Sequence, residues 1–262
     1  MRVERTADRL APPPPGGGAA RAEPARPRAR DGLVPGTLWL GEGGALRCRT
    51  PHSLHVLPPT LALWVPQATP HQAEGLGGAR LRRIELPLAQ DVVGPKPATG
   101  RVALATPLLA ALADTLDGAC GDRPNAARRR LALALARDEL QGAEALAIGI
   151  ALPRSALLRR ACDAALHEEA DDCDLQTLAN AAGTSVRTLA RAFRQELDLP
   201  FSHWRLQVRL ARLVALWAEG RTLGASAAAV GYNSPSALSF MVRRLVGMTP
   251  SRLLSSTPGA AR

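Results

Sequence analysis

The spacing of hydrophobic and polar residues changes along the chain. Between Leu33 and Pro87, short runs such as TLWL, SLHVL and LALWV alternate with Gly- and Pro-rich breaks at intervals of about ten residues. Short runs rich in Leu, Val and Trp and punctuated in this way are typical of an antiparallel sandwich or barrel. A stretch of about 55 residues is small for an isolated core, so we expect the following helices or a second subunit to stabilise it.

Helical periodicity begins at residue 106. The run TPLLAALADTLDG predicts a helix that is capped by Thr106 and ends at Gly118. A second helix is predicted from about Asn125 to Gln141. The leucines expected on the inward faces of these helices are Leu108, Leu109, Leu112, Leu116, Leu131, Leu135 and Leu140. We interpret residues 101–153 as a helical connector and a surface for homodimerisation.

The segment LQTLANAAGTSVRTLARAF, which starts at Leu175, fits a helix-turn-helix. The small Ala179 lets two helices approach closely, and Gly183 ends the first helix where a positive φ is needed. Leu189 and Phe193 would pack the second helix against the first. The candidate DNA contacts lie at the start and on the outward faces of that second helix: Ser185, Arg187, Thr188, Arg191 and Arg194.

A second copy of this pattern follows. Ala227 and Gly231 repeat the alanine–glycine spacing of the first unit, and Pro235 takes the first position of a second recognition helix that ends near Gly247. The candidate DNA contacts of this unit are Asn233, Ser234, Ser236, Ser239, Arg243 and Arg244.

One helix is predicted between the two units, over residues 201–219. Its expected inward residues are Leu206, Leu210, Leu213 and Leu216, and its expected outward residues are Arg205, Arg209 and Arg212. A helix of this length is a rod of roughly 28 Å. Since one turn of DNA measures about 34 Å, a single chain could place two recognition helices in successive major grooves.

These motifs resemble those of a known protein family. From about Arg154 to Leu254, the chain resembles the DNA-binding domain of AraC-type bacterial transcriptional regulators, in SVRTLARAFRQEL, FSHWRLQVRLARL and VGYNSPSALSFMVRRLVGMTPSRLL. The closing Gly-x-Thr-Pro-Ser, from Gly247 to Ser251, is among the most diagnostic pieces, whereas Asp198 stands where the family usually has glycine. The resemblance implies a sequence-specific transcription regulator, not an enzyme, with promoter DNA and RNA polymerase as partners.

The N-terminal part resembles the small cupin-like sensor of such regulators, in LHVLPPTLALWVPQATPHQAEG. This resemblance implies a small-molecule effector, with His71 as a candidate contact. Cupins that hold a metal pair a histidine at this later position with an upstream His-x-His and a Glu, and the upstream pair is missing here, so we predict no metal and no cofactor. The predicted fold is α+β with two domains: a cupin-like barrel or sandwich over 32–100 with the helical connector, then an all-α double helix-turn-helix domain over 154–255.

Charge and composition agree with a nucleic-acid partner. The chain has 33 Lys+Arg against 23 Asp+Glu, a net charge of +10, and such a surplus favours a polyanion. A hydrophobic fraction of 46% excludes wholesale disorder and fibrous proteins. Residues 1–31, with consecutive prolines at 12–15, and residues 256–262 are predicted to be disordered tails. The sequence shows no signal peptide and no apolar run of membrane-spanning length, so we expect a cytoplasmic protein.

Three other classes of function stay open. A cupin-type oxygenase or isomerase with a basic DNA-binding appendage would need the missing metal ligands. A DNA-repair alkyl transferase would need an activated cysteine, whereas the four widely spaced cysteines predict ordinary reduced thiols: Cys48, Cys120, Cys162 and Cys173. A non-specific DNA-coating protein would bind with an affinity that does not depend on sequence.

Overall fold

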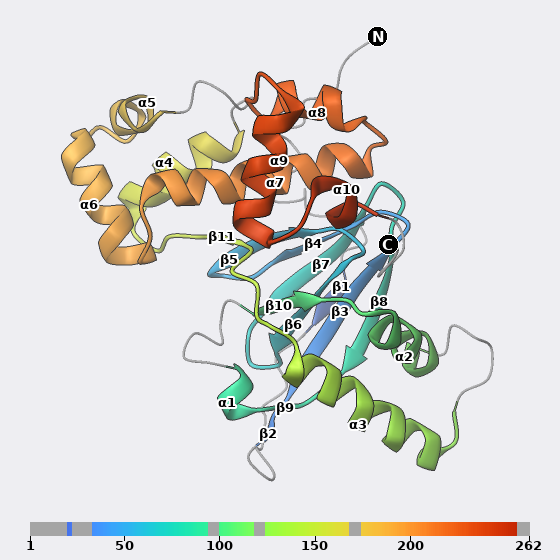
Figure 1. The fold of residues 1–262 in the computed structure, drawn as a ribbon. Helices are drawn as coiled ribbons and strands as arrows, with labels where there is room; N and C mark the ends of the chain where they lie inside the picture. The colour runs from blue at the N-terminus through green and yellow to red at the C-terminus, as the bar shows by residue number, and fades with distance from the viewer. Residues whose placement is uncertain (1–19, 23–32, 94–99, 118–123, 168–173, 256–262) are drawn as a thin grey trace. The chain divides into compact units, whose positions relative to one another are not determined.

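The computed structural model describes residues 20–22, 33–93, 100–117, 124–167 and 174–255 (Figure 1). Contacts divide the chain into two compact units. The β-rich unit comprises residues 19–51, 57–147 and 251–262, and the helical unit comprises residues 1–18, 52–56 and 148–250. The predicted two-domain α+β fold is confirmed. The cupin-like assignment of the first domain stays a prediction.

Antiparallel strands build the β-rich unit. They are β1 (Ala20–Ala22), β2 (Leu33–Val34), β3 (Gly36–Glu42), β4 (Ala45–Arg49), β6 (Leu61–Pro66), β7 (His71–Leu76), β8 (Arg80–Glu85), β9 (Leu88–Ala89) and β10 (Arg101–Leu104). One sheet has the order β10-β6-β3-β8, a second contains β1-β7-β4, and β2 pairs with β9. The expectation that the short apolar runs are strands of an all-β layer is therefore confirmed.

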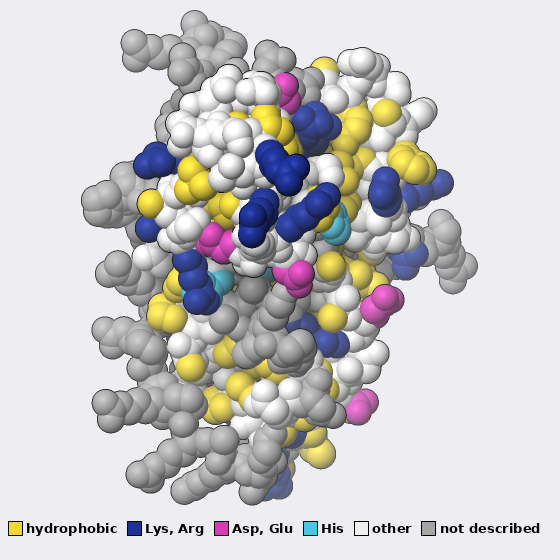
Figure 2. Space-filling view, turned by 90° about the vertical axis from the view of Figure 1, so that its left-hand side faces the viewer, with side chains coloured by type: hydrophobic (Ala, Val, Ile, Leu, Met, Phe, Trp, Pro, Cys, Tyr) yellow, Lys and Arg dark blue, Asp and Glu magenta, His cyan; other side chains and the backbone are white. Residues whose placement is uncertain are grey.

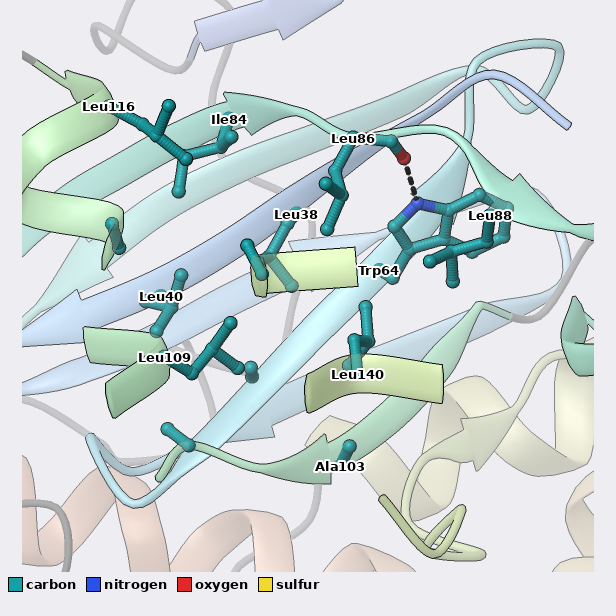
Figure 3. Packing of buried hydrophobic residues seen from close by; sticks show 14 of the residues in the cluster. Leu38, Leu40, Trp64, Ile84, Leu86, Leu88, Ala103, Leu109, Leu116 and Leu140 are labelled. Atoms are coloured by element: carbon teal, nitrogen blue, oxygen red, sulfur yellow. Dashed lines mark hydrogen bonds between the residues drawn. The ribbon is translucent and has the colours of Figure 1, made fainter. Parts of the chain in front are cut away.

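The core of this unit follows from the alternation of side chains along a strand. Leu38 and Leu40 of β3 lie in one cluster with Trp64 and Ile84 of the neighbouring strands and with residues of α2 and α3, such as Leu140 (Figure 3). The register pairs Leu38 with both Trp64 and Ile84, so all three point to the same face. The Trp64 indole N–H donates to the carbonyl oxygen of Leu86 at 2.6 Å, which satisfies a buried polar group (Figure 3).

Helices α2 (Pro107–Asp117) and α3 (Ala126–Gly142) cover that face of the sheet, and a short helix α1 (Gln90–Val93) precedes them. Thr106 caps α2 as predicted, because its hydroxyl accepts from the Leu109 amide at 3.0 Å. Arg82 of β8 ties the sheet to α2 through Asp114, with a separation of 2.7 Å between nitrogen and oxygen.

Three of the leucines expected to face inward on these helices do not. Leu108 is 45% exposed, Leu131 is 67% exposed and Leu135 is 49% exposed. The buried residues of α3 are instead Ala132, Ala136 and Leu140. The physical reason is close approach: small alanines bring α3 near α2 and the sheet, and the larger leucines one position earlier then point to the surface.

The prediction of a disordered N-terminal tail is wrong for residues 20–22. These residues form β1 and pair with β7, with Ala20 opposite Ala73 and Ala22 opposite His71. A short extended segment can satisfy the unpaired backbone groups of an edge strand whatever its side chains are. The rest of residues 1–31, and residues 256–262, lie outside the described part of the chain.

The helical unit contains one strand pair and a series of helices. The strand β5 (Ser53–Leu57), of which residues 53–56 belong to this unit, pairs with β11 (Ile150–Ala151). The helices are α4 (Ala156–His167), α5 (Leu175–Ala181), α6 (Val186–Leu197), α7 (Phe201–Ala218), α8 (Leu223–Ala229) and α9 (Pro235–Val246), and α10 (Pro250–Leu253) follows them. The expected helix between the two helix-turn-helix units is α7, and its bounds agree with the prediction within one residue.

Candidate nucleic-acid interface

The first helix-turn-helix consists of α5 and α6, joined by a tight turn. Gly183 adopts φ +68°, and the amide of Thr184 reaches back to the carbonyl oxygen of Ala179 at 2.9 Å. Ala179 is fully buried, so the two helices approach closely there. The Ser185 hydroxyl then accepts from the Thr188 amide at 3.1 Å and caps α6. The turn and the cap are therefore as the sequence predicts.

Helix α6 has one buried face and one basic face. Leu189 and Phe193 are fully buried, while Arg187, Arg191 and Arg194 are all exposed. Basic side chains gather on the side of the helical unit that carries α5 and α6 (Figure 2). A helix held by its apolar stripe and presenting guanidinium groups outward is suited to a polyanionic surface.

The second helix-turn-helix consists of α8 and α9 and repeats this geometry. Gly231 adopts φ +80°, and the Tyr232 amide bonds to the carbonyl oxygen of Ala227 at 2.9 Å. The Ser234 hydroxyl accepts from the Ala237 amide at 3.2 Å, and Pro235 takes the first helical position. The sequence repeat is thus a structural repeat.

The candidate DNA-contact residues fall into two groups, according to how exposed each side chain is and whether it already caps a helix. Exposed side chains that an external ligand can reach are Arg187, Thr188, Arg191, Arg194, Asn233, Ser236, Arg243 and Arg244. The hydroxyls of Ser185 and Ser234 are used as caps, and Ser239 is half-buried. Phe240, which the sequence reasoning did not include, lies on the exposed face of α9 and is 68% exposed.

One of the orientations expected for α7 is wrong. Arg212 is only 5% exposed and donates to the carbonyl oxygen of Ala165 in the last turn of α4 at 2.8 Å. An arginine near a helix C-terminus satisfies a carbonyl that has no helical partner. The expected inward residues Leu210, Leu213 and Leu216 are buried, and Leu206 is half-buried. Gln207, Ala211 and Ala215 on other sides of the helix are buried as well. Helix α7 is therefore enclosed on more sides than an amphipathic stripe predicts.

The other two arginines of α7, Arg205 and Arg209, lie against aromatic rings. The guanidinium carbon of Arg205 lies 5.9 Å from the centre of the Phe201 ring, and that of Arg209 lies 5.1 Å from the centre of the Tyr232 ring. These distances are in the range of cation–π contacts. Arg205 and Arg209 are half-buried rather than fully outward.

Glu196 of α6 has a structural role that the sequence reasoning missed. Its carboxylate accepts from the backbone amides of Arg154 and Ser155, just before α4 begins. Partial burial raises the pKa of Glu196, but the hydrogen bonds from Ser155 and Arg154 outweigh it and lower the pKa below its usual range. Helix α6 is therefore tied to the start of α4 as well as to α5.

His71, the candidate effector contact, is buried between the two sheets of the β-rich unit and is 5% exposed. Its Nε2 accepts from the Trp39 indole N–H at 3.0 Å, which places the proton on Nδ1, where it donates to the carbonyl oxygen of Thr69 at 2.8 Å. Burial lowers the pKa of His71, and the bond to Thr69 opposes this shift. Both ring nitrogens therefore have protein partners.

The structure describes two of the four cysteines. Cys48 and Cys162 are buried thiols and form no disulfide, and burial raises the pKa of Cys48 to about 12. This is the opposite of the shift that activates a nucleophilic thiol. Cys120 and Cys173 lie outside the described ranges.

The part of the chain that the structure describes has no group of three or more His, Cys, Asp or Glu side chains arranged to hold a metal ion. None of the helices in the same ranges is long and apolar enough to cross a bilayer.

The chain is similar to several known proteins. Residues 178–256 match the sequence model of a family described as a helix-turn-helix domain. The HTH-type transcriptional regulator NimR of Escherichia coli is 26% identical over 221 residues, which cover 84% of this chain and 80% of NimR. The HTH-type transcriptional regulator RipA of Corynebacterium glutamicum is 31% identical over 108 residues, which cover 41% of this chain and 33% of RipA. A crystal structure of unsaturated fatty acid bound ToxT from Vibrio cholerae aligns over 87% of this chain and 89% of ToxT, with 10% identity and a TM-score of 0.40.

Two helix-turn-helix units on one chain, with a matching family model and relatives named as regulators, define a DNA-binding transcription regulator rather than an enzyme. The metal-dependent oxygenase or isomerase considered as an alternative is therefore set aside. The resemblance to the AraC type is confirmed, and the helix-turn-helix domain of this chain is of that type.

Proposed function

We propose that α6 and α9 are the two recognition helices of this regulator and that they enter successive major grooves of promoter DNA. The observation that carries the proposal is the repeat itself: each helix begins at a capping serine, buries an apolar face against its partner helix and exposes arginines on the opposite face. The 18 residues of α7 between them span roughly 27 Å, close to the ~34 Å repeat of the duplex.

We assign the exposed polar residues of each helix to two kinds of contact. Arg187 and Arg194 on α6, and Arg243 and Arg244 on α9, supply positive charge to phosphates, and Arg191 in the middle of α6 reads a guanine. Asn233 and Ser236 at the start of α9, and Thr188 at the start of α6, supply shorter polar contacts, with Ser185, Ser234 and Ser239 beside them. Phosphate contacts position the domain, and base contacts give it sequence preference.

The test uses the full chain and a pool of random duplex DNA. Repeated selection should enrich one site, and a footprint on that site should show two protected segments about one helical turn apart. Arg191→Ala should weaken protection in one segment and Arg243→Ala in the other. Arg130→Ala is the matched control, because it removes a positive charge that is also exposed, from α3 in the other unit.

The salt dependence of the same binding reaction separates specific from non-specific contact. The logarithm of the affinity should fall linearly with the logarithm of salt concentration, by about 0.9 for each phosphate contact. Enrichment of no site, with equal affinity for all duplexes, would contradict the proposal and support the non-specific coating protein instead.

We further propose that the β-rich unit takes a small-molecule effector. The division of the chain supports this, since the helical unit carries both DNA-binding motifs and the β-rich unit is a separate compact body. The outcome to measure is a ligand-dependent rise in the melting temperature together with a change in affinity for the selected site. Since both ring nitrogens of His71 are engaged, an effector bonded to His71 would have to replace Trp39 or Thr69.

A second copy of this chain is proposed as the partner of α3. Leu131 and Leu135 lie one helical turn apart on its exposed face, and such apolar surface is often covered in a homodimer. Sedimentation should show a dimer that Leu131→Glu with Leu135→Glu converts to a monomer. Contact with RNA polymerase stays a prediction from the family resemblance.

A further inference from the structure

Phe240 is the most exposed large hydrophobic side chain in the described part of the chain, at 68%. It lies in the middle of α9, and the residues one turn away on the same face are Ser236, Arg243 and Arg244, all exposed. The buried residues Leu238 and Val242 lie on the opposite face. A single exposed apolar side chain is common on protein surfaces, so the case for a ligand depends on the position of Phe240 within the recognition helix.

The internal repeat shows which position Phe240 occupies. Both recognition helices begin after a capping serine, Ser185 for α6 and Ser234 for α9. When the sequences of α6 and α9 are aligned at their capping serines, the buried pair Leu189 and Phe193 of α6 corresponds to the buried pair Leu238 and Val242 of α9.

The same alignment places Arg191 and Phe240 at one position, six residues after each cap. This is the centre of the exposed face of each helix. The first unit thus presents a hydrogen-bonding cation where the second presents an apolar ring. The two half-sites must therefore be read by different chemistry at that position.

We propose that Phe240 is a specificity-determining residue that packs against the C5-methyl group of a thymine in the major groove. A·T pairs are the pairs that offer an apolar group there, whereas a phenylalanine has nothing to give to the donors and acceptors of a G·C pair. Arg243 and Arg244, one turn further along, hold the helix to the phosphates beside it. This inference rests on the proposed function, because it requires α9 to lie in the major groove.

The experiment compares thymine with uracil in the site that the full chain selects from random duplex DNA. Uracil lacks only the methyl group, so each thymine of the α9 half-site is replaced in turn. Loss of one buried methyl contact should weaken binding of the wild type about fourfold at one thymine. Phe240→Ala should bind the unmodified site less tightly and should lose this sensitivity to uracil.

A second variant makes the test independent of any loss of binding. Phe240→Arg gives α9 the same central residue as α6, so the preferred pair at that position should change from T·A to G·C in a repeated selection. Phe240→Ala should melt at the wild-type temperature, because the side chain is exposed. Its affinity for non-specific duplex should also be unchanged, since no charge is removed.

The outcomes are separable. A selected site with no preferred thymine in the α9 half, or with full affinity after every uracil replacement, overturns the role of Phe240 and leaves the proposed function standing. Unchanged DNA binding by Phe240→Ala also overturns the inference. Failure to select any site overturns both the inference and the proposed function.

Discussion

Asp198 ends the first recognition helix in a conformation that its side chain disfavours. Its φ is +58° and its ψ is +30°, and it is the only residue other than glycine with a positive φ in the described ranges. In the second unit the equivalent residue, 13 positions after the capping serine, is Gly247, with φ +75°. The same helix end is therefore built once with a strained residue and once with the residue that suits it.

Asp198→Gly should raise the free energy of unfolding of the helical unit. A left-handed conformation costs a residue with a Cβ atom roughly 1–2 kcal/mol. Replacement by glycine removes this strain, but glycine has more conformational freedom in the unfolded chain. That freedom lowers the free energy of unfolding by about 0.5–1 kcal/mol and offsets part of the gain. The expected net gain is about 0.5–1 kcal/mol, or a rise of a few degrees in melting temperature.

Two further variants isolate the backbone contribution. Asp198→Ala removes the same carboxylate but keeps the strain, so it should be about 1 kcal/mol less stable than Asp198→Gly. Gly247→Ala introduces the strain into the second unit, where a Cβ atom would meet nothing within 4 Å, so its cost of about 1 kcal/mol is conformational alone.

The assay is thermal and urea unfolding of the full chain, monitored by far-ultraviolet circular dichroism. Amide hydrogen exchange of α6 shows whether the change in stability lies in this helix. Equal stabilities of Asp198→Gly and Asp198→Ala would refute the reasoning, because only the backbone argument separates these two variants.

Three other predictions concern single side chains. Arg191→Ala should weaken binding to the selected site by about 1–3 kcal/mol and change the preferred bases; a uniform loss across all sequences in a binding array would reduce it to a phosphate contact. Leu189→Ala should lower the free energy of unfolding by about 2–5 kcal/mol in urea titrations, since a fully buried leucine leaves a cavity, and a loss under 1 kcal/mol would contradict the burial. The lowered pKa of His71 means that the unfolded chain binds the proton more tightly, so stability should be constant above about pH 6.5 and fall as the pH decreases below it. His71→Gln should flatten that fall in melts at stepped pH, and an unchanged slope would show that another group titrates there.

Local chemistry in the sequence determined the DNA-binding motifs. The positive φ of Gly183 and Gly231, the serine caps of α6 and α9 and the burial of Leu189 all follow from interactions within a few residues. Helix periodicity and capping are short-range effects, so one sequence is enough to read them. The strands of the β-rich unit were predictable for the same reason, from alternation and turn residues.

Long-range packing determines which side chains of a helix are buried where the periodicity of the sequence does not. Sequence periodicity marked Leu131 and Arg212 as inward and outward respectively, and the structure reverses both. A small residue such as Ala132 is buried when a neighbouring helix comes close, and an arginine is buried when a distant carbonyl, here that of Ala165, needs a donor. Neither partner is visible along the chain.

Phe240 on α9 is another residue whose exposure depends on tertiary packing and not on the local sequence pattern. Sequence spacing placed the second recognition helix correctly, but an aromatic residue inside a helix is by default assigned to a core. Only the tertiary structure shows that Leu238 and Val242 already fill the space against the partner helix and leave Phe240 on the outside. Which side chain of a helix is buried depends on the surface that it packs against, and that surface is made by residues far away in the sequence.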